Sequence, residues 1–408
     1  MEGKRYFGMD IHRDYAVLAA VSRPKEMVMS PRRVDFVKLE AWLRANLRPE
    51  DEVALEATVN AWTVHDLVSP LVARCVVADA RQIRLIANAS VKTDAQDALR
   101  LASLLSVDML PEVWVPPQHV RDVRTLIAHR MTLCKRRVIA LNRIRSVLNR
   151  HNLEQPDDLE AGNDWLLRIE GDLSTVERLL VADDLASLLP LNAGLAIAEG
   201  ELARMSQDAN WRDMAPRVMQ LTGFGIVHTM TVLGAIGDIQ RFESAQQLAG
   251  YTGLYPSKDQ SGQKDRSGRI TKHGRRDLRH VLVEAARTAV RMDARWKKEH
   301  ETLCARMHEF CALTAIARKL AELIWHVLHE VEPARHATDE QLAKKFLSIR
   351  DQLRAQKIEV IESRMFIRQQ MRKIGHRSQA TEYMHGKRRR LIASEAELAA
   401  FEAENSKD

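Results

Sequence analysis

The chain has 408 residues, with 62 Lys and Arg against 55 Asp and Glu and a net charge of +7. That length predicts two or three domains, each with its own core, and the basic charge favours a polyanionic partner. The four cysteines lie apart without a C-x-x-C pair, which argues against a disulfide framework and a zinc knuckle. No apolar run approaches the ~18 residues of a membrane span, so we expect a cytoplasmic protein with no membrane partner.

The first predicted domain, residues 1–115, alternates strands and helices. Residues 5–21 contain two apolar runs around a polar turn, which predicts a β-hairpin. The segments that follow predict a helix at 34–47, a strand at 53–55, a helix at 58–72, a strand at 75–78 and a helix from Thr93. This order predicts a mixed sheet flanked by helices.

Four carboxylates mark this domain. Asp94 and Asp97 lie three residues apart behind the capping residue Thr93, so both point to one side of the helix. Two like charges held so close suit a divalent cation such as Mg²⁺; the alternative is a solvated first turn that the helix dipole favours. Asp10 and Glu56 each end a buried strand, and ligands gather at such strand ends in α/β sheets. The four carboxylates are therefore predicted to converge on one or two cations.

The second predicted domain, residues 116–215, is helical. Residues 120–149 contain no Gly or Pro and combine one apolar stripe with an almost wholly cationic remainder, which predicts a long coiled-coil or bundle helix. The cations could form a solvated face, but the near absence of acids favours phosphate contact. Helical spacing at 165–180 and 184–214 predicts two antiparallel helices that close a hairpin. The candidate nucleic-acid contacts here are Arg124, Arg130, Arg136, Arg137 and Arg143.

The third predicted domain, residues 216–335, holds a G-F-G corner between two helices. Gly223 and Gly225 would expose backbone N–H groups to a phosphate, as in a helix-hairpin-helix motif; the alternative is an ordinary tight turn. A glycine-rich, cationic loop at 257–276 then leads into a helix at 277–290. We expect this loop to be flexible and to lie along a nucleic-acid backbone. With Lys92 of the first domain, its candidate contacts are Lys258, Lys264, Arg266, Arg269, Lys272, Arg275 and Arg276.

The last segment, residues 336–408, is predicted to be helical and charged. It contains K-R-R-R at 387–390 and an acidic end at 395–404. A docking helix, a nucleic-acid arm and a disordered tail all remain open. The fold class predicted for the whole chain is α/β plus all-α.

Three motifs in order resemble a known family. G-M-D at 8–10, L-E-A-T at 55–58 and K-T-D-A-Q-D-A at 92–98 are similar to the RuvC-like, ribonuclease-H-type domain of DEDD transposases from the bacterial insertion-sequence group one hundred and ten. The resemblance implies that Asp10, Glu56, Asp94 and Asp97 form a catalytic, Mg²⁺-binding tetrad. One departure is that residues 59–61, Val-Asn-Ala, stand where the family usually has a glycine and an aromatic residue.

Residues 253–279 resemble the C-terminal transposase domain of the same family, whose pattern is G-L-x-P, S-G, K-x-G and L-R-x-x-L. The resemblance implies that Ser261 is the catalytic serine, with Ser267 as its competitor in a second S-G. A serine hydroxyl needs a base or a metal to become a nucleophile. His273 lies nearby in sequence, and the tetrad could activate the serine if the two domains meet.

The resemblance therefore implies a transposase or recombinase that acts on donor and target DNA through a covalent phosphoserine intermediate. It also implies a noncoding bridge RNA as guide, and a dimer or tetramer in which the serine domain of one subunit meets the RuvC-like domain of another, assembled with help from the coiled coil. Two alternatives remain. One is a metal-dependent, structure-selective nuclease that uses activated water, and the other is a non-enzymatic DNA-binding or architectural protein.

Overall fold

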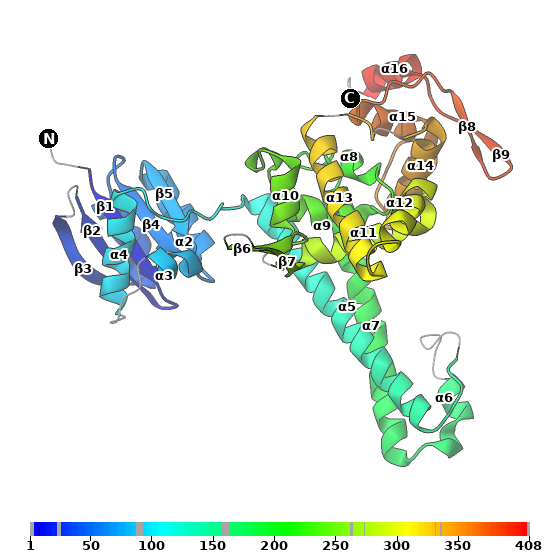
Figure 1. Cartoon of the computed structure of the whole chain (residues 1–408), viewed down its shortest axis with the longest axis horizontal. Coiled ribbons are helices and arrows are strands. Elements are labelled where there is room, and N and C mark those ends of the chain that lie inside the picture. The colour runs from blue at the N-terminus through cyan, green and yellow to red at the C-terminus, as the bar shows by residue number, and fades with distance from the viewer. Residues whose placement is uncertain are drawn as a thin grey trace. The chain divides into compact units, whose positions relative to one another are not determined.

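The computed structural model describes residues 4–22, 26–86, 93–156, 164–261, 264–272, 274–330, 332–334 and 337–405. The chain divides into two compact units, Met1–Pro116 and Pro117–Asp408 (Figure 1). The finer division of the second unit into three domains stays a prediction.

The first unit is built on a five-stranded sheet with the order β3-β2-β1-β4-β5. β1 pairs antiparallel with β2, and β2 pairs antiparallel with β3, whereas β1, β4 and β5 run parallel. The predicted mixed α/β architecture is confirmed, but the sequence analysis missed β3. The strands are β1 Tyr6–Ile11, β2 Tyr15–Val21, β3 Met27–Asp35, β4 Glu52–Glu56 and β5 Arg74–Ala78.

Helices cover both faces of this sheet. On one face α1 (Phe36–Asn46) and α2 (Ala61–Val68) contribute Leu39, Leu43 and Val64 to a core with Phe7 and Met9. On the other face α4 (Asp94–Ser106) packs Leu101 and Leu105 against Tyr6 and Ala54. All six residues of β1 are buried as a result, which explains why every residue of the strand except Asp10 is apolar or glycine. The short elements η1 (Ser69–Leu71) and α3 (Ala80–Ile86) flank β5 in the chain.

The second unit begins with a helical arm made by α5 (Gln118–Arg150) and α7 (Thr175–Met205), with α6 (Asp164–Arg168) between them in sequence. Arg143 faces Asp184 and Arg130 faces Glu199, so the two long helices are antiparallel. The predicted hairpin within 165–214 is wrong, because α7 continues unbroken through residues 180–184 and its partner is α5. Asp184, the predicted start of the second helix, lies inside α7, where it is buried and paired with Arg143.

A helical body follows the arm, and α11 and α13 pack together at its centre. The predicted flexible loop at 257–276 is wrong for most of its length, because β6 and β7 pair there as an antiparallel hairpin. The elements of the body are α8 Ala215–Met219, α9 Ile226–Ile236, η3 Ile239–Arg241, α10 Ala245–Tyr251, β6 Pro256–Ser261, β7 Lys264–Ile270, α11 Arg276–Met292, α12 Ala294–Cys304 and α13 Glu309–His329.

The C-terminal extension is folded over its described residues, 337–405, so the disordered-tail alternative does not hold there. Its α14 and α15 pack together, and a short hairpin projects from them (Figure 1). The elements are α14 Asp339–Ala355, α15 Ser363–Lys373, β8 Glu382–His385, β9 Arg388–Leu391 and α16 Glu395–Asn405.

One described helix, α7, is long and apolar enough to cross a membrane by length and composition alone. It contains Glu177, Asp183 and Asp184, and it packs along α5 through Val181 and Leu188. Several of its other apolar side chains are exposed.

Candidate active site

The end of β1 places Asp10 beside the end of β4. Met9 pairs with Leu55 in the parallel β1–β4 ladder, so Asp10 and Glu56 follow side by side at the carboxyl ends of the two strands. Gly8 lies two residues before Asp10 and therefore on the same face of the sheet. A Cβ atom at Gly8 would lie 2.0 Å from the backbone oxygen of Ala98. Only glycine at this position lets α4 approach β1 so closely.

This close packing brings the first turn of α4 to Asp10. Thr93 caps the helix as predicted and accepts a hydrogen bond from the Gln96 backbone N–H at 3.3 Å. Asp97 is buried and its Oδ1 accepts from Arg100 Nη1 at 2.7 Å. Asp94 is less buried, and its Oδ2 accepts from the Tyr15 hydroxyl at 3.0 Å. Both acids are therefore fixed by neighbours from the same unit.

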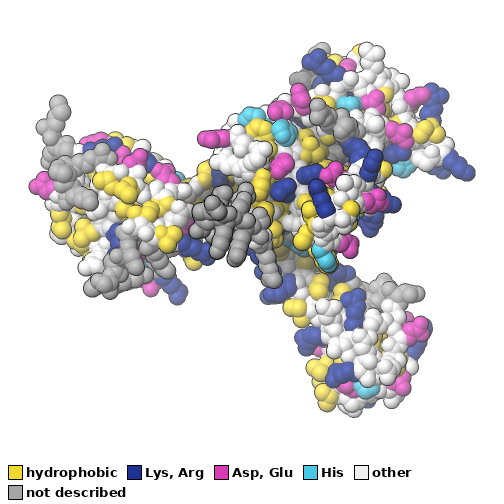
Figure 2. Space-filling model, viewed as in Figure 1, with side chains coloured by type: hydrophobic (Ala, Val, Ile, Leu, Met, Phe, Trp, Pro, Cys, Tyr) yellow, Lys and Arg dark blue, Asp and Glu magenta, His cyan; other side chains and the backbone are white. Residues whose placement is uncertain are grey.

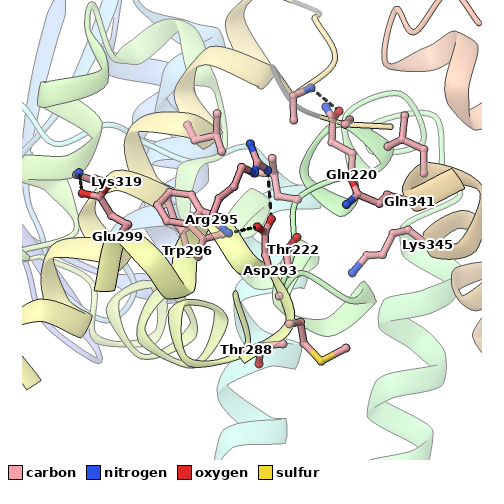
Figure 3. A pocket seen from close by; sticks show the side chains of 18 of the residues that line it. Gln220, Thr222, Thr288, Asp293, Arg295, Trp296, Glu299, Lys319, Gln341 and Lys345 are labelled. Atoms are coloured by element: carbon pink, nitrogen blue, oxygen red, sulfur yellow. Dashed lines mark hydrogen bonds and ion pairs between the residues drawn. The ribbon is translucent and has the colours of Figure 1, made fainter. Parts of the chain in front are cut away.

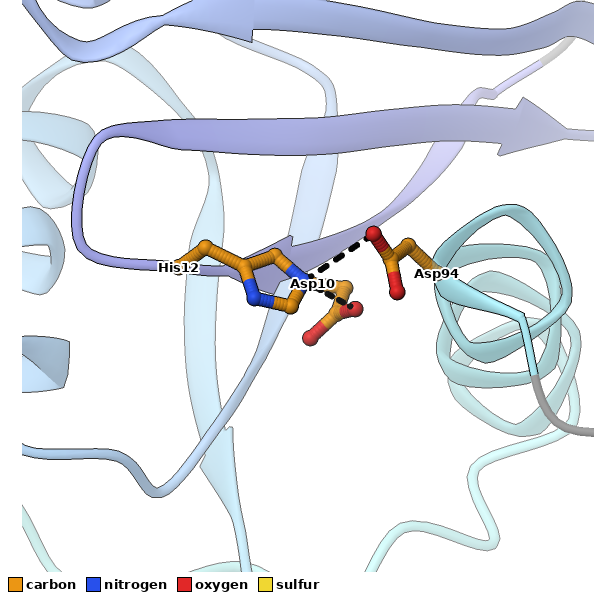
Figure 4. Close-up of side chains that lie close together, drawn as sticks. All are labelled: Asp10, His12 and Asp94. Atoms are coloured by element: carbon orange, nitrogen blue, oxygen red, sulfur yellow. Dashed lines mark hydrogen bonds and ion pairs between the residues drawn. The ribbon is translucent and has the colours of Figure 1, made fainter.

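A histidine completes the cluster (Figure 4). His12 Nε2 lies 3.1 Å from Asp10 Oδ2 and 3.2 Å from Asp94 Oδ2. One ligand atom from each of Asp10, His12 and Asp94 lies within 4.8 Å of the other two. The His12 ring also stacks on Tyr15, with 4.6 Å between the ring centroids. Sequence reasoning missed His12, although its position two residues after Asp10 in the turn was a usable signal.

Burial and charge act together on Asp10. Burial raises the pKa of its carboxyl group, His12 lowers it, and the nearby Asp94 and Asp97 raise it again. The charges of these groups therefore influence one another, and a cation among them would favour the ionised form of the carboxylates. Carboxylate oxygens suit Mg²⁺ or Mn²⁺, and an imidazole nitrogen suits the transition metals. The donor set therefore fits a divalent cation.

The predicted tetrad is only partly gathered in this cluster. Asp10 and Asp94 lie in the three-residue group with His12. The charge of Asp97 raises the pKa of Asp10, and Asp97 itself is ion-paired with Arg100. Glu56 is partly buried at the neighbouring strand end and is not part of that group.

The two candidate serines lie on the β6–β7 hairpin. Ser261 ends β6 opposite Lys264, at the turn end of the hairpin, and Ser267 lies within β7 opposite Lys258. The predicted contacts Arg266 and Arg269 lie on β7. Lys92 and His273 fall outside the described residues.

The G-F-G corner is shaped by packing. Gly223 has a positive φ of 96°, and a Cβ there would lie 2.5 Å from the backbone oxygen of Ala285 in α11. His228 Nδ1 lies 3.0 Å from the Gly223 carbonyl oxygen, and burial lowers the pKa of His228. Gly225 is the N-cap residue of α9. Phosphate binding by Gly223 and Gly225 stays a prediction, since close packing by itself explains why Gly223 is glycine.

Most of the candidate arginines on α5 have partners within the chain. Arg124 donates to the Gly234 and Ala235 carbonyl oxygens at 2.7 and 3.0 Å, and Arg137 donates to Asn192 Oδ1 at 2.9 Å. Arg130 and Arg143 pair with acids of α7, as described above. Acids of α7 therefore neutralise part of the positive charge of α5. Arg136, in contrast, is exposed. Of the remaining candidates, Arg275 pairs with Asp277 at 2.5 Å, and Lys272 and Arg276 are exposed.

The second unit also contains a cavity of about 1040 Å³, bordered by α11, α12, α13 and α14 (Figure 3). Two of its cations are paired with acids, Lys319 with Glu299 and Arg295 with Asp293. Lys345 points into the cavity, and burial lowers its pKa to about 8. This lining does not resemble the acidic cluster of the first unit.

Comparison with known proteins identifies the family. Residues 7–153 match the IS110-type DEDD family described as "Transposase", and residues 215–301 match "Transposase IS116/IS110/IS902 family". The chain belongs to this transposase family. It is 26% identical over 359 residues to "Transposase for insertion sequence element IS1111A" of Coxiella burnetii, covering 82% of this chain and 92% of that one.

Two further relatives agree with this assignment. The chain is 26% identical over 302 residues to "Putative transposase y4qE" of Sinorhizobium fredii, covering 67% of this chain and 74% of that one. It is 28% identical over 262 residues to "Probable family 20 transposase" of Pseudomonas aeruginosa, covering 60% and 77%. The protein is a DNA transposase, so DNA is its substrate and the non-enzymatic alternative does not stand. Membership among DEDD transposases implies dependence on a divalent metal, in keeping with the acidic cluster.

Proposed function

We propose that this transposase cuts and rejoins insertion-sequence DNA with two chemical centres, a Mg²⁺ site on the first unit and Ser261 on the second. The observation that carries the proposal is the cluster of Asp10, His12 and Asp94, which a buried sheet and a closely packed helix hold within 4.8 Å. Such acids are costly to hold together unless a cation joins them.

Several features of the first unit support the proposal that it is an RNase H-like, RuvC-like domain. Three antiparallel strands are followed by two parallel ones in the order β3-β2-β1-β4-β5. Asp10 and Glu56 lie at the ends of β1 and β4. The helix α4, which packs on the Gly8 face of the sheet, carries two further acids, Asp94 and Asp97. This arrangement supports the assignment of Asp10, Glu56, Asp94 and Asp97 as the tetrad.

In this proposal Asp10 and Asp94 hold the cation, and Asp97 and Glu56 complete the tetrad beside them. A Mg²⁺ held there would supply positive charge for the phosphate and for the attacking and leaving oxygens. The remaining residues position the acids: Tyr15 donates to Asp94, and Arg100 donates to Asp97.

Ser261 is the proposed nucleophile. Its hydroxyl oxygen forms a bond to a DNA phosphorus as one phosphorus–oxygen bond of the strand breaks. The serine proton passes to a base, and the released DNA oxygen gains a proton. The phosphodiester energy is kept in the serine ester, so strand exchange requires no ATP. The S-G pattern and the position of Ser261 at the turn end of the hairpin support this role.

The proposed partners are donor DNA, target DNA and a noncoding bridge RNA, which the family resemblance and the basic charge support. A homo-oligomer is supported by the arm, where Leu179, Leu189 and Ile197 of α7 are 68%, 78% and 74% exposed. Apolar side chains exposed at this density favour burial against another copy of the arm. In such an oligomer Ser261 of one subunit would act with the tetrad of another, in the cytoplasm where the DNA lies.

A metal-dependent nuclease that uses activated water is the second candidate. It is favoured by one observation, that Asp10, Glu56, Asp94 and Asp97 all belong to the first unit. In that case the serine is dispensable.

One experiment separates the two. The full chain is incubated with Mg²⁺ and duplex DNA carrying the element ends, and strand cleavage is measured together with protein–DNA adducts that survive denaturation. Asp10→Asn should lose both products, and Ser261→Ala should lose the adduct and strand transfer while Ser267→Ala keeps them. An adduct that persists in Ser261→Ala would falsify the serine assignment. Normal cleavage without an adduct in that variant would establish the nuclease.

A further inference from the structure

The β8–β9 hairpin of the C-terminal extension lies outside both family matches, which end at residues 153 and 301. Its strands pair antiparallel, with Tyr383 opposite Arg390 and His385 opposite Arg388. A two-residue turn, Gly386 and Lys387, joins them, and Gly386 has a positive φ of 63°, as tight hairpin turns require. The hairpin projects from the helices, and Lys and Arg side chains stand out along it (Figures 1 and 2).

The two faces of this hairpin differ in charge. Residues opposite each other in a ladder share a face, so Tyr383, His385, Arg388 and Arg390 lie on one face. Beyond the buried Tyr383, this face carries the exposed cations Arg388 and Arg390 beside the exposed His385, with Lys387 at its tip. In the described part of the chain, no carboxylate forms an ion pair with Lys387, Arg388 or Arg390.

The opposite face is different. It carries Arg389, which is ion-paired with Glu382, and the apolar residues Met384 and Leu391, which are 45% and 61% exposed. The uncompensated charge of the hairpin is therefore confined to one face and the turn.

A buried arginine holds the hairpin in place. Arg368 of α15 is only 1% exposed. Its guanidinium group donates to the carbonyl oxygens of Ser378 and Ala380 at 2.6 Å, before the hairpin, and of Ala393 at 2.5 Å, after it. Tyr383 and Ile392 are buried at the base of the hairpin. The buried guanidinium group is hydrogen-bonded through all three of its nitrogens to the segments before and after the hairpin. These bonds fix the base of the hairpin on α15.

We propose that the β8–β9 hairpin binds the phosphate backbone of duplex DNA through Lys387, Arg388 and Arg390. The partner follows from charge complementarity and from the DNA substrate of a transposase. Phosphate is the proposed ligand because the three side chains are cations without a carboxylate partner in the described residues, and most protein–DNA hydrogen bonds go to phosphate and sugar. A two-stranded ribbon is also narrow enough to lie along a DNA groove. This inference does not depend on the serine or the metal chemistry proposed above.

The test measures how the affinity of the full chain for duplex DNA depends on salt concentration. Binding is measured by fluorescence anisotropy, in EDTA so that no strand is cut. Each phosphate contact contributes about 0.9 to the slope of log affinity against log salt concentration. The triple variant Lys387→Gln, Arg388→Gln, Arg390→Gln should therefore reduce the slope by about 2.7. A slope unchanged in the triple variant would overturn the proposal.

The hairpin supplies its own matched control. Arg388→Gln and Arg389→Gln remove the same charge from neighbouring positions, but Arg389 is already paired with Glu382. Arg388→Gln should lower the slope by about 0.9, and Arg389→Gln should leave it unchanged. Equal changes in slope for the two variants would show that only net charge matters, which contradicts the proposal. A reduced slope with RNA duplexes but not with DNA would make RNA the partner, which also contradicts it. Unchanged melting temperatures will confirm that the exposed substitutions leave the fold intact.

Discussion

The two units of this transposase carry their polar groups in different ways. In the first unit Asp10, Asp94 and Asp97 are held by the packing of α4 against β1, and Asp10 and Asp97 are buried. In the second unit Ser261 and many of the cations lie on two-stranded hairpins attached to a helical body. The comparison implies that stability and chemistry are coupled in the first unit and separable in the second.

The largest effect is expected from Asp10→Asn. Removing one carboxylate from the cluster weakens cation binding and should lower strand cleavage by about 10³-fold, equivalent to about 4 kcal/mol. Cleavage of element-end DNA at saturating Mg²⁺ measures this loss. Asp66→Asn changes an acid of the same unit outside the cluster and should retain full activity. Equal losses in the two variants would refute a special role for Asp10.

Gly8→Ala tests the coupling in the first unit. The added methyl group would collide with the Ala98 oxygen and the Ala102 nitrogen, so α4 must shift. We expect the free energy of unfolding to fall by about 3 kcal/mol and metal-dependent cleavage to fall with it. Denaturant unfolding and Mn²⁺ binding measure the two effects. Gly250→Ala is the control, because its added Cβ meets no atom within 4 Å. A Gly8→Ala protein that stays stable and active would show that stability and chemistry are not coupled in the first unit.

Lys345→Met tests the separation in the second unit. Burial lowers the pKa of Lys345 from 10.5 to about 8, so the unfolded chain binds this proton more tightly between those values. The lysine therefore destabilises the fold fully below pH 8, and this penalty is relieved as pH rises toward 10.5. Methionine should raise the free energy of unfolding by roughly 2 kcal/mol at pH 7 and less at pH 10.

The readouts for this variant are denaturant unfolding at both pH values and DNA cleavage at pH 7. Cleavage should be unchanged, because Lys345 belongs to the cavity of the second unit and not to the proposed chemical centres. A stability gain that is the same at both pH values would contradict the assigned cause.

The smallest effect is expected on the arm. Arg136 is exposed, whereas Arg130 is paired with Glu199 at 2.5 Å. If the arm contacts phosphates, Arg136→Gln should reduce the salt slope of DNA binding by about 0.9 and Arg130→Gln by less. The reverse order would show that the ion pair on the arm opens when DNA binds.

The sequence analysis predicted the buried part of the first unit well. Short apolar runs mark β1 (residues 6–9) and β4 (residues 53–55), and the cap at Thr93 follows from residue type. It missed β3 because that strand is an edge strand, mostly exposed and containing Pro31, so no buried run identifies it. It missed the pairing of α7 with α5 because that contact depends on residues far apart in sequence.

The candidate site shows the same limit. Residue types and order were enough to single out Asp10, Glu56, Asp94 and Asp97. The position of His12 between two acids required the path of the β1–β2 turn, and the role of Gly8 required the contact between β1 and α4. The spacing of His12 from Asp10 hints at the first of these contacts, but no local pattern shows the second.

The most direct test of the two-centre account is to locate the DNA on the protein. The adduct formed with Mg²⁺ is trapped, digested with nuclease and trypsin, and analysed by mass spectrometry. Cleavage after Lys258, Lys264, Arg266 and Arg269 places Ser261 and Ser267 on different peptides. The account predicts a nucleotide on the peptide 259–264, and a nucleotide on 267–269, or an active enzyme with none on either, would contradict it.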